Sequence, residues 1–410
     1  MIEKLRATYD EFPSQFWLIM VATLIDLMGG FLIFPFFSLY FTDKFSVTLA
    51  EAGLIYAIWA VTGVGGQILG GALTDRVGRK RMIIAGLIFS ALSSIALALA
   101  QDFTMVYITA AVGGLFSRSA GPARSAMIAD LLPEDKLTEG YAIWRVVSNV
   151  AFAIGPALGG LLASISFVLI FFVDAITSVL TAIFIFLFLK ESQSQSAALI
   201  TSRQSLTKVF GGYFAVLKDR TLIAVILLGS LVGLVYWQWY FSVPVFMRDV
   251  HGFPPHYYGS LMSISGIIVV FIQLPLTRKL RPIAPLLVLA GGSLLYAFGF
   301  GIFAIIAGYA LFLLAFVIIT FGEMIVQPTQ QSIVARLAPE EMRGRYIAVG
   351  GLAYSLPTMI GPTLGGYLLD KYEPNLIWYI AAVICITGVV GYLTLHRRLS
   401  RSGDGILSSK

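Results

Sequence analysis

The sequence predicts an all-α membrane protein of about twelve transmembrane helices, built as two pseudo-symmetric six-helix bundles. Three observations predict this fold class. Apolar residues make up 58% of the 410 residues and charged residues only 12%, about half the charge of an ordinary soluble domain. Apolar runs of about 20 residues, the length that crosses a bilayer, recur along the whole chain. Motifs of the first half also reappear in the second half.

Each apolar run is expected to form one membrane span. The first six are expected at Phe16–Phe41, Ala50–Leu73, Met82–Ala100, Met105–Met127, Thr138–Ala163 and Phe167–Leu189. The last six are expected at Thr221–Met247, Tyr257–Thr277, Ile283–Ala307, Gly308–Val334, Tyr346–Leu369 and Leu376–Leu395. The first run is too long for a cleaved signal peptide, follows acidic residues and lacks a small-residue cleavage site. We therefore expect one bundle over residues 1–190, a linker over 191–220 and a second bundle over 221–410.

Lysine and arginine are distributed unevenly between alternate loops. One set of loops carries most of them, whereas the opposite set carries only Lys44, Arg248 and Lys371. Because cytoplasmic loops are enriched in these residues, both termini are expected in the cytoplasm and the protein in the plasma (inner) membrane. This placement accounts for the net charge of +6, so no nucleic-acid partner is expected.

The linker is the only sizeable polar segment between expected spans. Its second part places apolar residues at the i, i+3, i+4 spacing of an amphipathic helix, at Leu206, Val209, Phe210, Tyr213, Phe214 and Leu217. The spacing predicts either a short helix on the cytoplasmic membrane face or a solvated linker helix.

Several function classes are disfavoured by what the sequence lacks. It contains one cysteine, Cys385, and three histidines that lie outside the expected spans or at their ends, so no metal or cofactor is expected. No nucleophile–base constellation indicates an intramembrane enzyme, and no phosphate-binding loop indicates nucleotide-driven pumping. A linker of about thirty residues is small for the soluble output region of a receptor. Transport of a small solute is the function class that remains.

The two halves of the chain share motifs at a shift of about 206 residues. The segment Gly-Pro-x-x-Gly-Gly occurs in the expected fifth span at Gly155, Pro156, Gly159 and Gly160, and in the eleventh from Gly361 and Pro362. Small residues let helices approach closely and proline bends them, so these segments are expected to form either flexible or purely structural helix contacts. Two parallel halves can form a central site with alternate access from both sides.

The loop after the second expected span carries the most specific motif. Its ten residues from Gly71 to Lys80 fit G-x-x-x-D-R-x-G-R-[RK] at every specified position, through Gly71, Asp75, Arg76, Gly78 and Arg79. This is the signature loop of the major facilitator superfamily, and the chain is identified as a member. The resemblance implies the major-facilitator-type fold, with this loop as a latch that favours the outward-open state. Gly71 and Gly78 would permit a tight turn with close helix approach. The alternative is that the basic residues only set topology.

Further motifs resemble the twelve-span drug:proton antiporter group of this superfamily. The Gly-Pro segment of the fifth span is similar to the antiporter motif, with Ala151 in place of its leading glycine, and Gly29 and Pro35 resemble a motif of the first span. In the fourth span, Ala111 stands where proton-coupled members usually carry an arginine. The resemblance implies protons and a small-molecule substrate as partners.

Ionisable residues inside the membrane cost several kcal/mol, so each needs a partner or a function. Arg118 lies seven residues beyond Ala111 and therefore faces the same way on a continuous helix. We expect it to pair with Asp26, which is then either a proton carrier or half of a structural pair. Arg124 is expected to reach the interface or to pair with Asp130 or Glu134.

Other polar residues in the expected spans have two open interpretations each. Arg145 and Asn149, one turn apart in the fifth span, could face a cavity or hold spans together. Asp174, near the start of the sixth span, is expected to be a cap or a helix contact. In the tenth span, Glu323 is followed at helical spacing by Gln327 and Gln330. This polar stripe must face protein or water, and its carboxyl group could exchange protons, bind a cationic substrate or make a structural hydrogen bond.

Aromatic residues are concentrated well inside the seventh expected span, at Tyr236, Trp237, Trp239 and Tyr240. Together with Phe34 of the first span, they are candidates for a cavity wall that attracts amphiphilic or cationic molecules. Lipid-facing packing explains such rings equally well.

Taken with the resemblance, these patterns predict a proton-coupled exporter of small amphiphilic or drug-like molecules. It is expected to work as a monomer in the lipid bilayer by alternating access, with Asp26, Glu323 and Arg118 as proton-coupling candidates. The alternative within transport is a facilitator or a proton-coupled carrier of a metabolite such as a sugar, a carboxylate or a lipid-like solute.

Overall fold

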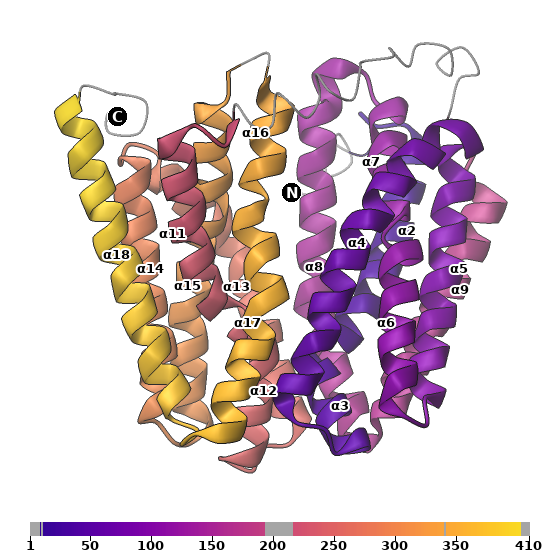
Figure 1. The fold of residues 1–410 in the computed structure, drawn as a ribbon. Helices are drawn as coiled ribbons and strands as arrows, with labels where there is room; N and C mark the ends of the chain where they lie inside the picture. The colour runs from indigo at the N-terminus through magenta and orange to yellow at the C-terminus, as the bar shows by residue number, and fades with distance from the viewer. Residues whose placement is uncertain (1–8, 10, 193–215, 340–341, 403–410) are drawn as a thin grey trace. The chain divides into compact units, whose positions relative to one another are not determined.

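A computed structural model describes residue 9 and residues 11–192, 216–339 and 342–402, which form helices joined by turns and short loops (Figure 1). In these ranges, eleven helices are long and apolar enough to cross a membrane. The protein is thus an integral membrane protein of the all-helical class. The expected linker helix, built on residues 206–217, lies outside the described residues except for its last two positions.

The helices follow the order of the expected spans. The first half contains α2 (Ser14–Ile33), η1 (Phe34–Phe36), α3 (Phe37–Phe45), α4 (Leu49–Val77), α5 (Arg79–Leu99), α6 (Phe103–Ser117), α7 (Ala120–Leu131), η2 (Glu134–Lys136), α8 (Leu137–Ile165) and α9 (Phe167–Phe188). The second half contains α11 (Arg220–Tyr236), α12 (Gln238–Asp249), α13 (Pro255–Leu280), α14 (Pro285–Gly301), η4 (Ile302–Ala304), α15 (Tyr309–Leu337), α16 (Arg343–Gly350), α17 (Leu352–Lys371) and α18 (Leu376–Ser402).

The fourth expected span is not one continuous helix. It is divided into α6 and α7 at Arg118 and Ser119, which leaves each piece shorter than a span. Pro122 has no N–H to donate to the Arg118 carbonyl, and the Gly121 N–H bonds that carbonyl in a tighter turn at 3.3 Å. The prediction of an uninterrupted helix over Met105–Met127 is therefore wrong in this respect.

Three other spans are also interrupted. The first changes to a 3-10 turn around Pro35, the seventh breaks at Trp237 between α11 and α12, and the eleventh breaks at Gly351 between α16 and α17. In transporters, broken membrane helices commonly surround the substrate and ion sites.

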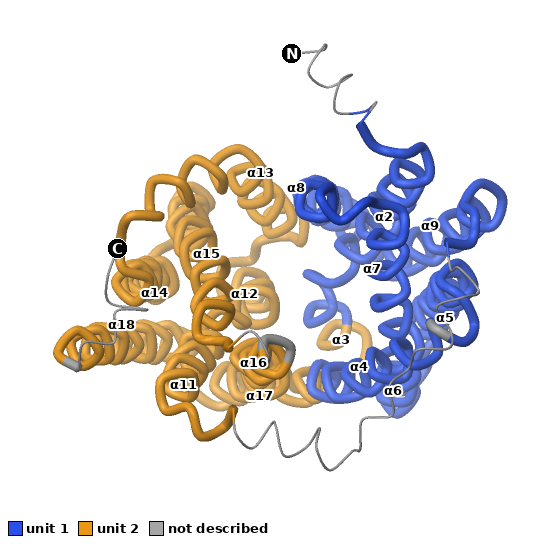
Figure 2. Tube along the Cα trace, turned by 90° about the horizontal axis from the view of Figure 1, so that it is seen from above, with its two compact units in different colours: residues 1–40, 55–201 blue, residues 41–54, 202–410 orange. Residues whose placement is uncertain are grey.

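The helices form two compact units (Figure 2). Unit 1 comprises residues 1–40 and 55–201, and unit 2 comprises residues 41–54 and 202–410. Residues 41–54, which contain most of α3 and the start of α4, thus belong to unit 2 although their chain neighbours belong to unit 1. The Asp370 carboxylate holds this segment, because it accepts hydrogen bonds from the backbone N–H groups of Leu49 and Ala50 at 3.0 and 2.8 Å.

The Gly-Pro segments lie at close helix contacts in their own units. In unit 1, a Cβ atom on Gly155 would come within 2.6 Å of the Phe31 Cβ, and one on Gly159 would overlap the Leu32 carbonyl. In unit 2, the space for a Cβ on Gly365 is occupied by the Gln238 side chain. The first and fifth spans of each half are therefore in close contact, α2 with α8 in unit 1 and both α11 and α12 with α17 in unit 2.

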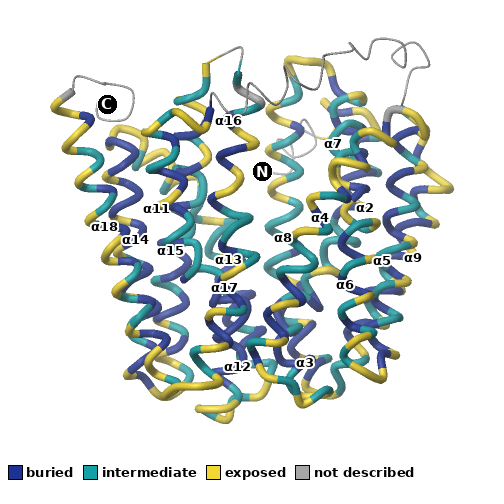
Figure 3. Tube along the Cα trace, viewed as in Figure 1, coloured by how far each residue is buried: buried dark blue, intermediate teal, exposed yellow. Residues whose placement is uncertain are grey.

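Figure 3 shows exposed residues along the membrane helices. Many of these exposed residues are large and apolar. Phe271 is 75% exposed, Ile68 69% and Phe186 66%. Soluble proteins rarely expose apolar surface on this scale, whereas lipid chains solvate it. The pattern agrees with membrane insertion of both units.

Candidate functional site

The centre of unit 2 holds a carboxyl group among tyrosines. The Tyr236 hydroxyl donates a hydrogen bond to Oε1 of Glu323 at 2.7 Å, and it lies 3.1 Å from the Tyr240 hydroxyl. Within the described ranges, Glu323 forms no ion pair with a lysine, arginine or histidine. Its carboxyl group therefore has hydroxyl neighbours but no counter-charge.

The break in the seventh span positions these tyrosines. Tyr236 is the last residue of α11 and Tyr240 lies in the first turn of α12. The two hydroxyl groups lie 3.1 Å apart, and that of Tyr236 bonds Glu323 of α15. The Tyr236 ring also lies 5.8 Å from the Tyr296 ring of α14. Sequence reasoning missed Tyr296, whose only signal was its position in the interior of the expected ninth span.

The two tryptophans of the predicted aromatic group have different surroundings. The Trp239 ring is fully buried and packs edge to face on Phe316, with the centroids 5.5 Å apart. Trp237 lies beside Tyr240 at 5.8 Å and lines a small cavity. Trp239 is therefore a packing residue of unit 2, whereas Tyr236, Trp237 and Tyr240 are near the carboxyl group or the cavity.

The polar stripe of α15 continues along that cavity. Gln327 and Gln330 line it together with Tyr236 and Tyr354, and its volume is about 20 Å³, enough for about one water molecule. Gln330 is 4% exposed, and its amide nitrogen has no hydrogen-bond partner among the described atoms. The stripe thus faces the inside of unit 2, as expected for polar groups at membrane depth.

Unit 1 contains a different arrangement, an ion pair between Asp26 and Arg124. The Arg124 Nη2 and Asp26 Oδ2 atoms are 2.7 Å apart, and both side chains are largely buried. The predicted pairing of Asp26 with Arg118 is therefore wrong. Arg118 is the C-cap of α6, and the carboxylate is reached instead by Arg124 of α7.

Arg118 instead lies over the ring of Trp59, with 4.2 Å between the guanidinium carbon and the ring centroid. The Phe34 ring lies 6.3 Å from the same tryptophan and 6.1 Å from Tyr56. Phe34, Tyr56, Trp59 and Arg118 thus form one aromatic–cationic cluster. Sequence reasoning missed Tyr56 and Trp59, although their spacing of three residues in an apolar run placed them on one helix face.

Asp174 is a second buried carboxyl group of unit 1. It is 4% exposed and accepts a hydrogen bond from the Ser94 hydroxyl, so it joins α9 to α5. Its Oδ1 atom also lies 2.7 Å from the position of a Cβ on Gly29. Among the polar residues of α8, Arg145 is exposed and Asn149 is half-buried. The described residues provide no hydrogen bond or ion pair to either side chain.

The signature loop is anchored within unit 1. Gly78 has a φ of 103°, a conformation that favours glycine, and it ends the turn between α4 and α5. The Arg79 Nε atom lies 3.0 Å from Asp130 Oδ2. Arg124 pairs with Asp26, so its expected pairing with Asp130 or Glu134 is wrong. The Glu191 carboxylate accepts the Arg79 backbone N–H at 2.9 Å, at the positive end of α5.

The structure contradicts the expectation for Gly71 of this loop and does not describe the side chain of Asp75. Apart from its own helix backbone, no described atom lies within 4 Å of the position of a Cβ on Gly71, so the expected close helix approach at this glycine is wrong. The Asp75 side chain lies outside the described part of the structure, and Arg76 is exposed.

The comparisons with known proteins agree with this architecture. A sequence model described as Major Facilitator Superfamily matches residues 19–362 and 331–406. The chain belongs to the major facilitator superfamily. The superfamily consists of transporters, so transport of a solute is the activity class that this membership assigns.

Two relatives illustrate the range of names in the family. The chain is 28% identical over 360 residues to a protein named Na(+), Li(+), K(+)/H(+) antiporter from Planococcus maritimus, covering 81% of this chain and 84% of that protein. It is 22% identical over 397 residues to the multidrug resistance protein MdtH of Shigella flexneri, covering 94% of each.

Solved structures support the fold alone. A POT family transporter in complex with 5-aminolevulinic acid has a TM-score of 0.79 and 13% identity, covering 94% of this chain and 97% of that chain. The nucleoside transporter NupG has a TM-score of 0.77 and 14% identity, covering 93% and 99%. At this identity the neighbours say nothing about the substrate of this member of the superfamily.

Proposed function

We propose that this member of the superfamily is a proton-coupled exporter of small amphiphilic or drug-like molecules, with Glu323 as its proton site. One observation carries the proposal: the Glu323 carboxyl group lies in unit 2 with a tyrosine hydroxyl at 2.7 Å and without an ion pair in the described structure. A carboxylate without a counter-charge is costly inside a membrane. Binding of a proton or of a cationic substrate removes that cost, so the two can compete for one site.

The hydrogen bond suits a group that exchanges protons. The ionised carboxylate accepts the Tyr236 hydroxyl, and the protonated acid can instead donate to a neighbouring oxygen. The Tyr240 hydroxyl, 3.1 Å from that of Tyr236, extends the chain of exchangeable groups. Asp26 has a weaker claim as the proton carrier, because Arg124 already neutralises it at 2.7 Å.

The aromatic residues around this group suit an amphiphilic substrate. The rings of Trp237 and Tyr240 contact each other, and both contact the ring of Tyr236, whose hydroxyl donates to the carboxyl group. Aromatic rings attract both apolar surfaces and organic cations, and the carboxylate adds charge selectivity. The relative named as a multidrug resistance protein agrees with a substrate of this class.

We further propose that two six-helix bundles, 1–190 and 221–410, move relative to each other to give alternating access. Both termini would lie in the cytoplasm and the protein in the plasma (inner) membrane, as the distribution of lysine and arginine favours. The loop with Asp75 and Arg79 would act as a gating element.

The test uses purified protein in proteoliposomes with an imposed pH gradient and a panel of cationic and neutral dyes. Gradient-driven dye movement is expected for the parent protein and is expected to be lost in Glu323→Gln. Glu373→Gln makes the same chemical change at an exposed position and should leave transport unchanged. Dye movement that ignores the gradient and persists in Glu323→Gln would indicate a facilitator and contradict the proposal.

A second candidate function is exchange of an alkali-metal cation for protons, favoured by the relative named as a Na(+), Li(+), K(+)/H(+) antiporter. Glu323 and the tyrosine hydroxyls offer oxygen atoms, the ligand type that hard cations prefer. The described residues contain no cluster of three or more acidic, histidine or cysteine side chains around a common point. Addition of Na⁺, Li⁺ or K⁺ to the same proteoliposomes would release internal protons only if this candidate is correct.

A further inference from the structure

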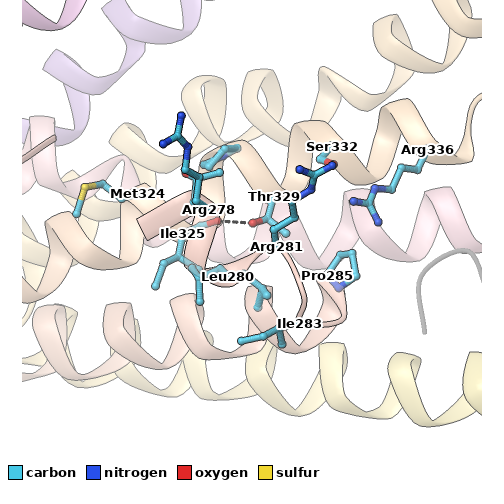
Figure 4. A pocket seen from close by; sticks show the side chains of 13 residues that line it. Arg278, Leu280, Arg281, Ile283, Pro285, Met324, Ile325, Thr329, Ser332 and Arg336 are labelled. Atoms are coloured by element: carbon cyan, nitrogen blue, oxygen red, sulfur yellow. Dashed lines mark hydrogen bonds between the residues drawn. The ribbon is translucent and has the colours of Figure 1, made fainter. Parts of the chain in front are cut away.

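A cavity in unit 2, shown in Figure 4, is lined by residues of α15 that do not belong to the Glu323 stripe. It has a volume of about 370 Å³ and is lined by the end of α13, the start of α14 and the last turns of α15. Glu323, Gln327 and Gln330 do not line it. The proposed transport mechanism therefore leaves this cavity without a function.

The polar lining of the cavity is strongly cationic. Arg278 and Arg281 contribute from the end of α13, and Arg336 contributes from the last turn of α15 (Figure 4). No aspartate or glutamate lines the cavity. Within the described ranges, none of these arginines forms an ion pair. Three exposed arginines thus border the cavity without a carboxylate, and such a set of charges favours an anion.

Two further features favour an anion at this place. Pro285, the first residue of α14, lines the cavity, and the start of a 17-residue helix carries partial positive charge. The Ser332 hydroxyl also lines the cavity, and it has no hydrogen-bond partner among the described residues. Arginine and hydroxyl donors together match the oxygen atoms of a phosphate group.

The remaining lining residues are apolar. Leu280, Ile283, Val288, Met324 and Ile325 form this part of the wall. Ile283 is 42% exposed, and Leu274, one helical turn before Arg278 on α13, is 58% exposed, so exposed apolar side chains lie near the cavity. A ligand with a charged group and an attached hydrocarbon chain would contact both parts.

The position of the cavity along the helices identifies the source of such a ligand. α13 and α15 are membrane helices that end at Leu280 and Leu337, so the arginines lie at their last turns, where phospholipid headgroups are found. Basic pockets between membrane helices at this level bind anionic lipid headgroups.

We propose that this cavity is a binding site for a phosphate group, supplied by an anionic phospholipid of the surrounding membrane. Arg278, Arg281 and Arg336 hold the phosphate oxygens, with Ser332 as an additional donor. The acyl chains follow the apolar wall toward Ile283 and Leu274. A soluble phosphate ester offers the same anionic group without the hydrocarbon chains, and the experiment separates the two sources.

The test titrates short-chain phosphatidylglycerol into the detergent-purified full chain, with phosphatidylcholine of equal chain length as the neutral comparison. The triple variant Arg278→Gln, Arg281→Gln, Arg336→Gln is expected to bind phosphatidylglycerol about 100-fold more weakly, since each arginine beside an anionic lipid contributes a factor of roughly five. Phosphatidylcholine binding should not change.

The matched control removes three arginines that do not line the cavity but lie in the last turns of α18. The triple variant Arg397→Gln, Arg398→Gln, Arg401→Gln removes the same charge from unit 2 but leaves the cavity lining intact. It is therefore expected to bind phosphatidylglycerol within about threefold of the parent protein. Equal losses in both triple variants would show that only total charge matters and would overturn the proposal. Equal binding of the two lipids by the parent protein would also overturn it.

A second variant keeps the test decisive if the arginine variant does not fold. Ser332→Phe retains all three charges and fills the cavity, so it should lose phosphatidylglycerol binding, and unchanged binding would overturn the proposal. Glycerol phosphate is titrated last, as a soluble phosphate ester without acyl chains. Weak binding of glycerol phosphate supports the lipid as the source, whereas binding as tight as that of phosphatidylglycerol supports a phosphate site filled from solution.

Discussion

Removal of Arg124 would leave the Asp26 carboxylate inside unit 1 without its counter-charge. The two groups lie 2.7 Å apart, and their side chains are only 13% and 17% exposed. Removing one partner of a buried pair costs roughly 3–5 kcal/mol, because the other charge is left uncompensated. Since neither side chain is fully buried, we expect Arg124→Gln to cost about 3 kcal/mol, the lower end of this range.

Arg118→Gln is the matched control, with the same chemical change six residues earlier. It removes the stacking of the guanidinium group on Trp59, a contact that contributes about 0.5–2 kcal/mol. The double variant Asp26→Asn, Arg124→Gln should recover part of the stability lost in Arg124→Gln, because no unpaired charge remains.

The thermal unfolding midpoint in detergent measures these differences. A change of 1 kcal/mol shifts the midpoint by about 2 °C in the larger proteins for which the scaling is known. We therefore expect a decrease of about 6 °C for Arg124→Gln and about 2 °C for Arg118→Gln. An equal or larger decrease for Arg118→Gln, or a double variant no more stable than Arg124→Gln, would refute the assignment of the ion pair.

Three further predictions concern other contacts in the structure. Tyr236→Phe removes the hydrogen bond to Glu323, and this bond stabilises the ionised carboxylate by about 1.5–3 kcal/mol. The pH profile of gradient-driven dye transport should therefore move to higher pH. An unchanged profile would count against Glu323 as the proton site. Asp370→Ala removes the acceptor at the start of α4 and should cost about 1 kcal/mol of stability, measured as a lower thermal midpoint. Gly159→Ala introduces a Cβ that overlaps a neighbouring carbonyl and should destabilise the protein by about 1–3 kcal/mol. Gly71→Ala is the control, because its Cβ meets no neighbouring element within 4 Å. It should leave the thermal unfolding midpoint unchanged or raise it.

The fold class follows from the sequence because a membrane allows few backbone structures. A backbone inside hydrocarbon must satisfy its own hydrogen bonds, so apolar runs of span length become helices. The match to the family motif between Gly71 and Lys80 added the superfamily, and the match over residues 19–362 and 331–406 confirms this membership. Composition and one short loop were sufficient to predict the fold class and the superfamily.

The polar stripe of α15 was also visible in the sequence. Glu323, Gln327 and Gln330 follow helical spacing in an otherwise apolar run, so they had to lie on one face. The partner of Glu323 was not visible in this way. Tyr236 is 87 residues away in the chain, and only the packing of α11 against α15 brings its hydroxyl group to the carboxyl group.

The sequence by itself thus determined the helices, their approximate limits, the superfamily and the polar residues that needed partners. Only the tertiary structure decided which partners they have. The fourth span breaks at Arg118, and Arg124 of the second piece, not Arg118, meets Asp26. Packing also placed Arg278, Arg281 and Arg336 around one cavity. Helical periodicity relates residues within one helix, whereas these contacts depend on how helices distant in the chain pack together.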